Sequence, residues 1–318
     1  DFTWSTSFNI SFNRNKVLSL TSGQDALLTS KAFDASVANI PDYIAKVGRP
    51  VAQFYGYIAD GMYQLNDFYK VPNGATGNYF YVLKEGIPYY GTKSTLSGIN
   101  TTVSAATSVQ PGDPKFKDIN NDGVLDQNDY TVIGHPYPVH FGGISNNFTY
   151  KNFDLNVFLQ WSYGNDVLDA NRIKMEGGTS APQAGSSGTT GNLGNVNTNQ
   201  YATYANRWTP ENPSNLYPRA NAMATGTRAY SSRIVEDGSY LRLKTVQLGY
   251  NLPVRVIKRL NMVSARFYVS AQNLLTLTHY SGPDPEVSTA TGSNLTPGFD
   301  YSPYPRTRVL TIGANLNF

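Results

Sequence analysis

A twelve-residue stretch before the middle of the chain carries the side chains best suited to chemistry. Residues 118–129 read DINNDGVLDQND, with Gly123 at the sixth position, where a calcium-binding loop turns sharply. Ca²⁺ is a hard cation that takes six to eight oxygen ligands, and the pattern predicts one structural Ca²⁺. The expected ligands are the side-chain oxygens at the first, third, fifth, ninth and twelfth positions and one backbone carbonyl, contributed by Asp118, Asn120, Asp122, Asp126, Asp129 and Val124.

The alternative for the same residues is a turn rich in Asp and Asn that holds no metal. The twelfth position is Asp rather than Glu, which shortens the reach of a bidentate ligand. The flanks are unlike paired helices, because residues 130–133 (YTVI) are β-prone and residues 134–138 (GHPYP) would break a helix. We therefore expect a structural calcium loop rather than a sensor that opens.

The sequence shows no catalytic constellation. His135, His140 and His279 share no ligand spacing, and the chain has no cysteine that could form a disulfide or a thiolate site. A phosphate-binding glycine loop, a nucleophile elbow and a pair of catalytic carboxylates are also missing. We expect that the protein is not an enzyme. Residues 207–210 (RWTP) and 217–219 (YPR) could line a polar ligand site or could simply pack between loops.

The first element that must position the loop is a predicted β-hairpin over residues 139–163. In residues 153–163 (FDLNVFLQWSY) apolar and polar residues alternate almost strictly, and residues 144–150 alternate in the same way. Lys151 and Asn152 suit a tight turn between the two strands. Each strand is long enough to cross a bilayer when tilted, and the apolar face ends in aromatic residues. A soluble β-sandwich also has alternating strands, so the hairpin alone leaves both architectures open.

Four further segments alternate similarly, at residues 4–13, 241–252, 265–277 and 306–318. In residues 241–252 the alternation changes phase near Thr245, which predicts a β-bulge. We expect lipid-facing side chains at Leu155, Val157, Leu159, Ile312 and Ala314, and lumen-facing side chains at Asn156, Gln160, Thr311 and Asn315.

The lengths of the connections between these six strands distinguish an outer-membrane barrel from a soluble β-sandwich. Long connections at residues 14–138, 164–239 and 278–305 alternate with short ones at residues 151–152 and 253–263. Outer-membrane barrels have long outside loops and short periplasmic turns, whereas sandwich connections have no reason to alternate. The pattern favours a barrel with the three long connections outside and the C-terminus in the periplasm. Within the second connection, residues 177–199 are Gly, Ser, Thr and Asn with few apolar anchors, which predicts a mobile loop.

The composition agrees with this all-β interpretation. Charged residues make up 15% and aromatic residues 13% of the 318 positions, which is poor in charge compared with about 25% in soluble domains. No apolar run is long enough for a membrane-spanning helix. The net charge of +3 says little about partners, and we expect no nucleic acid among them.

The sequence resembles the SusC/RagA type of TonB-dependent outer-membrane transporter. The similarity runs from Trp4 to Phe318 and includes four segments, GDPKFKDINNDGVLDQNDYTVIGHPYPVHFGGISNNFTYKNFDLNVFLQWSYGND, VEDGSYLRLKTVQLGYNLP, FYVSAQNLLTLTHYSGPDPE and TRVLTIGANLNF. It implies that residues 1–318 are the C-terminal part of one barrel of about 22 strands, filled by a plug, and supply its last six. The N-terminal plug and the TonB-contacting segment of the family are missing from this sequence.

The resemblance also implies a function and a place in the cell. It implies uptake of glycans or peptides across the outer membrane of a Gram-negative, Bacteroidetes-type bacterium, energised through TonB, with a SusD-like surface lipoprotein as the lid. The alternative is a barrel that does not transport and serves as a structural or binding scaffold in a surface complex.

Overall fold

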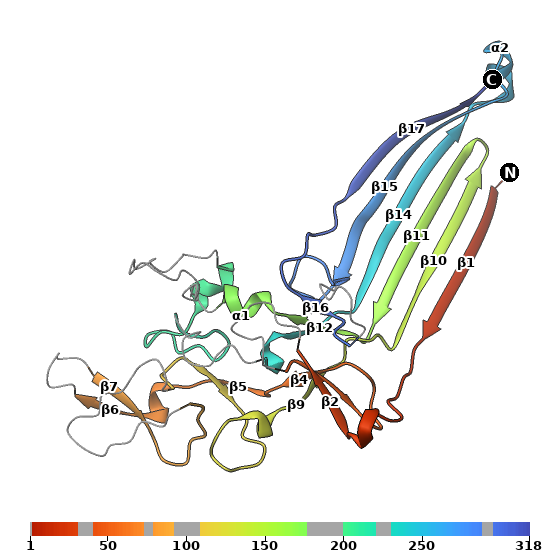
Figure 1. Ribbon diagram of the computed structural model, residues 1–318. Coiled ribbons are helices and arrows are strands. Elements are labelled where there is room, and N and C mark those ends of the chain that lie inside the picture. Colours follow the sequence, from red (N-terminus) through yellow and green to blue (C-terminus); the bar gives the residue numbers. More distant parts are fainter. Residues whose placement is uncertain are drawn as a thin grey trace, which may run out of the picture.

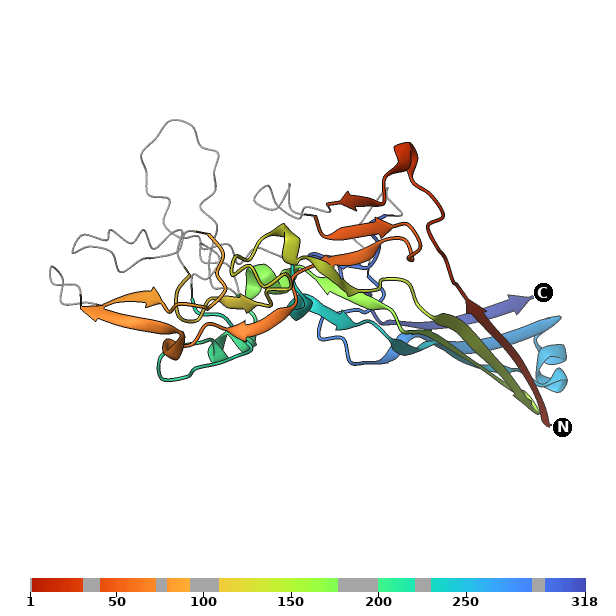
Figure 2. The ribbon, with the colours of Figure 1, turned by 90° about the horizontal axis from the view of Figure 1, so that it is seen from below.

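The computed structural model has two parts, a long sheet and a region of loops at one end of it (Figures 1 and 2). The structure describes residues 2–30, 41–72, 79–91, 109–176, 200–220, 230–287 and 295–318. We call the sheet the wall, and we call the described residues of the three long connections the loop region. Both chain ends lie at the end of the wall away from the loop region (Figure 1). No helix in the described part of the chain is long and apolar enough to cross a membrane.

The wall is one antiparallel sheet of six strands in which neighbours in the sheet are also consecutive wall strands in the sequence. Its strands are β1 (Phe2–Phe12), β10 (His140–Tyr150), β11 (Phe153–Tyr163), β14 (Tyr240–Asn251), β15 (Ser264–Thr278) and β17 (Val309–Asn317). The predicted hairpin is confirmed, since Tyr150 pairs with Phe153 across a two-residue turn. Lys151 in that turn has a φ of 53°, in the left-handed region that tight hairpin turns use.

One face of the wall is apolar from edge to edge. In one row across the sheet, Phe148, Leu155, Leu248, Val269 and Ile312 lie side by side on successive strands. Leu248, Val269 and Ile312 are 49%, 43% and 78% exposed, and Phe148 and Leu155 are partly exposed. A continuous apolar surface of this extent is unfavourable in water and matches the hydrocarbon of a bilayer.

The opposite face of the wall is polar. The neighbouring row consists of Asn147, Asn156, Gln247, Ser270 and Thr311. The register therefore places the two predicted sets on opposite faces, because alternate residues of a strand share a face.

The apolar face contains two polar side chains near its middle, Thr6 and Asn146, which pair across β1 and β10. Asn146 also lies opposite Val157. Its Oδ1 accepts hydrogen bonds from Thr6 Oγ1 at 2.7 Å and from Trp4 Nε1 at 3.1 Å. The amide oxygen is thus satisfied within the face, which lowers the cost of placing it among apolar groups.

The predicted bulge is confirmed at Lys244. Phe158 pairs with Thr245 and Leu159 pairs with Leu243, so Lys244 is an extra residue between two paired positions. The bulge restores the apolar face on both sides of the phase change.

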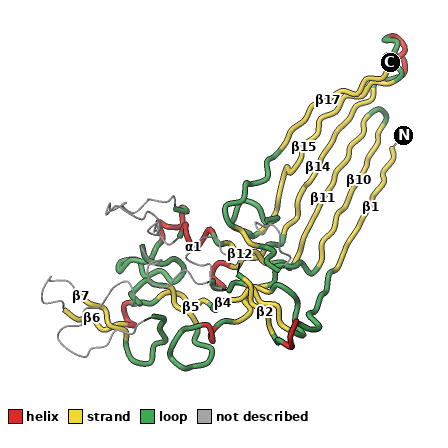
Figure 3. The backbone as a smooth tube through the Cα atoms, in the orientation of Figure 1, coloured by secondary structure: helices red, strands yellow, loops and turns green. Residues whose placement is uncertain are grey.

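The loop region is more regular than the sequence suggested, because short strands pair across it (Figure 3). A four-stranded sheet contains β2 (Ala26–Thr29), β3 (Tyr43–Lys46), β4 (Gln53–Gly56) and β9 (Thr131–Gly134). A three-stranded sheet contains β13 (Val235–Asp237), β12 (Asp166–Asp169) and β16 (Phe299–Asp300). Two strand pairs are β5 (Ala59–Met62) with β8 (Pro114–Phe116), and β6 (Phe68–Pro72) with β7 (Tyr79–Leu83).

Short helices complete the described structure. The α-helices are α1 (Asn171–Met175) and, in the short connection between β14 and β15, α2 (Val254–Arg259). Single turns of 3₁₀ helix cover Thr21–Gly23, Leu65–Asp67, Gln127–Asp129, Ala202–Asn206 and Ser232–Ile234. The predicted mobile loop at residues 177–199 lies outside the described residues.

The three long connections share one hydrophobic core. Tyr43 and Phe54 from the first connection pack with Leu168 and Ile234 from the second and Phe299 from the third, all of them nearly inaccessible to solvent. A second core, which includes Tyr63, Phe116 and Leu125, lies wholly within the first connection. The loop region is therefore one folded unit and not a set of independent solvated segments.

Candidate functional site

The predicted calcium loop lies between β8 and β9, and its first half is held by its own side chains. Asp118 Oδ2 accepts a hydrogen bond from Gly123 N, and Asp122 Oδ1 accepts one from Val124 N, both at 2.8 Å. Asn120 Oδ1 accepts a hydrogen bond from Asp122 N at 3.0 Å. Gly123 has a φ of 82°, a conformation that glycine adopts without strain.

The second half of the loop is closed by a buried carboxylate. Asp129 is inaccessible to solvent, and its two oxygens accept hydrogen bonds from Ile119 N at 2.8 Å and from Asp126 N at 3.0 Å. Asp126 in turn caps the 3₁₀ turn by accepting from Asn128 N at 2.7 Å. These contacts tie the last residue of the motif to residues 119 and 126 and so close the loop on itself.

The loop is anchored to the second core. Leu125 is buried there, and its backbone N–H donates to Tyr89 O at 2.8 Å. Val124 forms a single parallel bridge with Tyr89. These contacts fix the backbone at the turn and attach the loop to the second core.

The donor set of the loop suits a hard cation. The five predicted side-chain ligands are four carboxylates and one amide, and all of them would bind the ion through oxygen. Asp118 Oδ1 is buried and lacks a hydrogen-bond partner, as expected of an oxygen reserved for a metal. Across the described residues, however, no three His, Cys, Asp or Glu side chains are grouped closely enough to hold an ion. Calcium binding therefore stays a prediction.

Sequence inspection missed a second polar cluster, at the rim where the wall meets the loop region. Arg242 of β14 is buried, and its guanidinium donates to Asp284 Oδ1 at 2.5 Å, Glu286 Oε2 at 3.0 Å and Thr276 Oγ1 at 3.1 Å. Arg306 adds contacts of 3.0 Å to Glu286 and 3.6 Å to Asp284. The sequence feature that could have indicated this cluster is the presence of charged residues in wall strands that otherwise carry few charges.

The other segments singled out in the sequence serve packing. Trp208 is buried and donates from Nε1 to Gln64 Oε1 at 3.0 Å, and Arg219 Nε pairs with the buried Asp113 at 2.7 Å. His140 Nδ1 accepts a hydrogen bond from Trp161 Nε1 at 3.1 Å.

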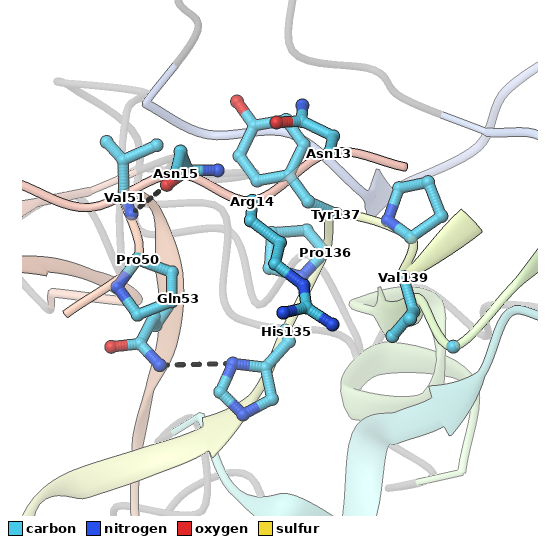
Figure 4. A pocket seen from close by; sticks show the side chains of 12 residues that line it. Asn13, Arg14, Asn15, Pro50, Val51, Gln53, His135, Pro136, Tyr137 and Val139 are labelled. Carbon is cyan, nitrogen blue, oxygen red and sulfur yellow. Dashed lines mark hydrogen bonds between the residues drawn. The ribbon is translucent and has the colours of Figure 1, made fainter. Parts of the chain in front are cut away.

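His135 lies in a pocket of about 510 Å³ where β1 leaves the wall and β10 enters it (Figure 4). Its Nδ1 is 3.0 Å from Gln53 Nε2, and Asn15 Oδ1 accepts a hydrogen bond from Val51 N at 2.8 Å. The side chain of Arg14 extends into the same pocket beside the imidazole (Figure 4). The prolines and valines around these groups leave few polar partners for a ligand.

A buried pair of carboxylates joins the second and third connections. Asp169 and Asp300 lie opposite each other on the parallel strands β12 and β16, and both are almost inaccessible to solvent. Asn171 Nδ2 donates to Asp169 at 2.9 Å and to Asp300 at 3.0 Å, and Tyr280 donates its hydroxyl to Asp300. Burial, followed by the charge of Asp300, raises the pKa of Asp169 to about 7. Burial also raises the pKa of Asp300.

This pair predicts a loop region that loosens as pH rises. A carboxyl group whose pKa is higher in the folded state stabilises fully below the unfolded value of 3.8, and this contribution is lost as pH rises through about 7. Each unit of pKa shift corresponds to about 1.4 kcal/mol. We expect Asp169→Asn to raise protection of β12 amides from hydrogen exchange at pH 8 more than at pH 5. The exposed Glu211→Gln is the control, and equal effects of Asp169→Asn at both pH values would contradict this account.

The sequence of this chain is similar to those of several TonB-dependent receptors. The chain is 33% identical over its whole length to TonB-dependent receptor P3 of Formosa agariphila and 26% identical to TonB-dependent receptor SusC of Bacteroides thetaiotaomicron. It covers 27% and 25% of those two proteins, so it spans about a quarter of the relatives it matches. No family model matches the chain.

Solved structures agree on the fold. The structure of the RagAB peptide transporter matches the whole chain with a TM-score of 0.64 at 20% identity, and the chain covers 27% of that structure's chain. The RagAB peptide importer in its open-open state matches with a TM-score of 0.63, again over the whole chain and 27% of that chain. At this identity the match supports the fold alone.

Proposed function

Because the chain belongs to the TonB-dependent receptors and is similar to SusC, we propose that it forms part of the wall of an outer-membrane nutrient importer of the SusC/RagA type. The proposal rests on the sequence similarity to a TonB-dependent receptor over the whole of this chain, together with a wall whose apolar face extends uncovered across six strands. The curated relatives are named as receptors, which agrees with the expectation that the protein is not an enzyme.

We propose that residues 14–138, 164–239 and 278–305 lie outside the cell and that the C-terminus lies in the periplasm. The supports are the alternating connection lengths and the folded loop region at one end of the wall (Figure 1). The remaining strands, the plug and the segment that contacts TonB would come from the rest of the protein. The polar face of the wall would then line the lumen.

The proposed cargo is a glycan or a peptide, and the proposed lid is a SusD-like surface lipoprotein. The structural neighbour RagAB is described as a peptide transporter, and the curated relatives include SusC. The shared core of the three connections gives a rigid outer surface on which a lid could sit. The aromatic and amide side chains of these connections suit polar ligands, since rings stack and amides hydrogen-bond.

The test is uptake of labelled glycan and peptide mixtures by cells that carry the full-length gene, with TonB present or deleted. We expect uptake to require both the receptor and TonB, because no ATP is present at the outer membrane to move a plug. Uptake that is indifferent to TonB, or a purified complex without plug and lid, would favour the scaffold function instead.

We further propose that residues 118–129 bind one Ca²⁺ on the outer side through the oxygens of Asp118, Asn120, Asp122, Asp126 and Asp129 and the Val124 carbonyl. The closed loop and the unpartnered Asp118 Oδ1 support this proposal. Calcium would neutralise the carboxylates gathered in the loop and stiffen the segment that leads into β9 and β10. Extracellular modules bind Ca²⁺ with dissociation constants of about 10⁻⁴–10⁻³ M, so such a site would stay filled outside the cell.

Removal of two ligands should abolish the response of the loop to calcium. For wild-type receptor we expect slower hydrogen exchange in residues 118–129 at millimolar Ca²⁺ than in a chelator. The double variant Asp118→Ala, Asp122→Ala should exchange rapidly in both conditions, with the wall strands unchanged. The neighbouring exposed Asp60→Asn should respond as wild type does. A wild-type loop that exchanges identically with and without Ca²⁺ would refute the site.

A further inference from the structure

A polar pocket lies at the rim of the wall, where all three long connections meet the polar face. It has a volume of about 400 Å³, and its lining includes Ser162 and Tyr240 from the wall, Asn165 from the second connection, Glu286 from the third and Arg306 from the segment that leads into β17. The first connection contributes two prolines. Ser162 pairs with Tyr240 across β11 and β14, in the alternation that places Asn156 on the polar face. The pocket therefore opens on the side that the proposed function assigns to the lumen.

The charged cluster beside this pocket is unbalanced. Among the described residues, Arg242, Lys244 and Arg306 form ion pairs with two carboxylates, those of Asp284 and Glu286, which leaves a surplus of one positive charge. Of these residues, Glu286 and Arg306 line the pocket. Lys244 lies two positions after Arg242 in β14 and is the extra residue of the bulge.

One carboxylate oxygen, Glu286 Oε2, contacts all three cations. Glu286 Oε2 lies 3.0 Å from Arg242 Nη1, 3.0 Å from Arg306 Nη1 and 3.8 Å from Lys244 Nζ. One carboxylate oxygen cannot satisfy three cationic groups fully, since each offers several N–H donors. The three cations therefore offer more N–H donors than these two carboxylates can accept.

Arg306 is the cation that can bind a further anionic group. Its side chain is 42% exposed, whereas that of Arg242 is 2% exposed and is committed to both carboxylates. Asp300 also acts electrostatically on Asp284, but it is buried and bound to Tyr280 and Asn171, and it does not line the pocket.

We propose that this rim pocket binds a carboxylate group of the cargo. Arg306 supplies the charged donor, and the hydroxyl of Tyr240 supplies a neutral one, whereas the Ser162 hydroxyl already donates to Asn165 Oδ1 at 2.7 Å. The inference rests on the proposed import function and narrows its cargo to molecules that carry a carboxylate, such as a peptide with a free C-terminus or a glycan that contains uronic acid. The planar guanidinium suits such a group because it can donate two parallel hydrogen bonds.

The experiment measures binding by the full-length receptor in detergent, with probes in matched pairs. One pair is N-acetyl-tetraalanine and its C-terminal amide, and the other is trigalacturonate and its methyl ester. Within at least one pair we expect the carboxylate to bind more tightly than its neutral twin, and the pair that discriminates identifies the source of the carboxylate. Arg306→Gln should weaken binding of that carboxylate about 10- to 100-fold, the range for a hydrogen bond to a charged group, and should leave the neutral twin unchanged.

Three further variants make the result specific. Arg306→Lys should keep most of the discrimination, and Glu286→Gln should tighten carboxylate binding because it frees the cations. Arg255→Gln, an exposed basic residue in α2 at the far end of the wall, should have no effect. If Arg306→Gln fails to fold, the Glu286→Gln result decides in its place.

The outcomes separate this inference from the import function. Equal binding of both members in both pairs, or discrimination that survives Arg306→Gln, would overturn the pocket assignment even if uptake still requires TonB. Carboxylate discrimination that depends on Arg306 in a receptor whose uptake ignores TonB would support the pocket and reject the import function.

Discussion

A charge at the centre of the apolar face should destabilise the barrel severely. We expect Val157→Arg to lower the free energy of unfolding by about 2–4 kcal/mol, the cost of arginine at the midplane of a lipid-facing barrel surface. Val157 is the fifth of the eleven residues of β11, with Asn146 and Val246 beside it on the same face. The measurement is urea denaturation of full-length receptor in lipid vesicles, followed by loss of the heat-modifiable folded band.

The adjacent residue provides the matched control. Asn156→Arg places the same side chain one position away on the polar face, where Asn156 Nδ2 now donates to Asn147 Oδ1 at 2.6 Å. We expect that variant to cost much less, because a lumenal arginine stays hydrated. Equal costs at both positions would mean that the two faces meet the same solvent, which contradicts a membrane wall.

Loss of one aromatic ring should loosen the loop region as a unit. Phe54 is inaccessible to solvent, and its ring packs edge-on against Tyr43 with a centroid distance of 5.3 Å. We expect Phe54→Ala to cost about 3–5 kcal/mol, the usual penalty for removing a buried Phe side chain. Hydrogen exchange should accelerate in β12 and β16 as well as in β4, because residues of all three strands line the same core.

An exposed aromatic on the same connection tests whether burial is responsible. Tyr69 in β6 is 46% exposed, and Tyr69→Ala should change exchange only locally. Acceleration confined to β4 in the Phe54→Ala variant would show that the three connections fold independently.

The wall could be predicted from the sequence because its rules are local. Alternation in residues 153–163 shows which side chains share a face, and the break near Thr245 shows where an extra residue must lie. The tight turn at Lys151 needs only its two neighbours. Each of these features is set by residues close together in the chain, and the structure confirms all three.

The loop region could not be predicted in the same way. Its core joins Tyr43 to Phe299, and its acidic pair joins Asp169 to Asp300, across gaps in the sequence that alternation cannot bridge. Arg242 likewise meets a partner 42 residues away. The calcium motif was visible because its ligands come from twelve consecutive residues, whereas the rim pocket depends on contacts that form only after folding.

Cysteine labelling tests directly whether this chain crosses the outer membrane with its loop region outside. These 318 residues contain no cysteine, and any cysteine in the rest of the full-length receptor would first be replaced. Single cysteines would be placed at Leu216 and Tyr304 in the loop region, at Leu260 beside α2 and at Ile312 on the apolar face, where side-chain exposures are 68%, 88%, 54% and 78%. Intact cells that express each full-length variant would then be treated with a membrane-impermeant maleimide.

We predict labelling at positions 216 and 304 in intact cells, labelling at position 260 only after the outer membrane is permeabilised, and no labelling at position 312 in either case. Position 312 is the decisive one, because its exposure would make it highly reactive if the apolar face met water. Labelling of position 260 on intact cells would reverse the orientation, and labelling of position 312 would contradict the membrane wall itself.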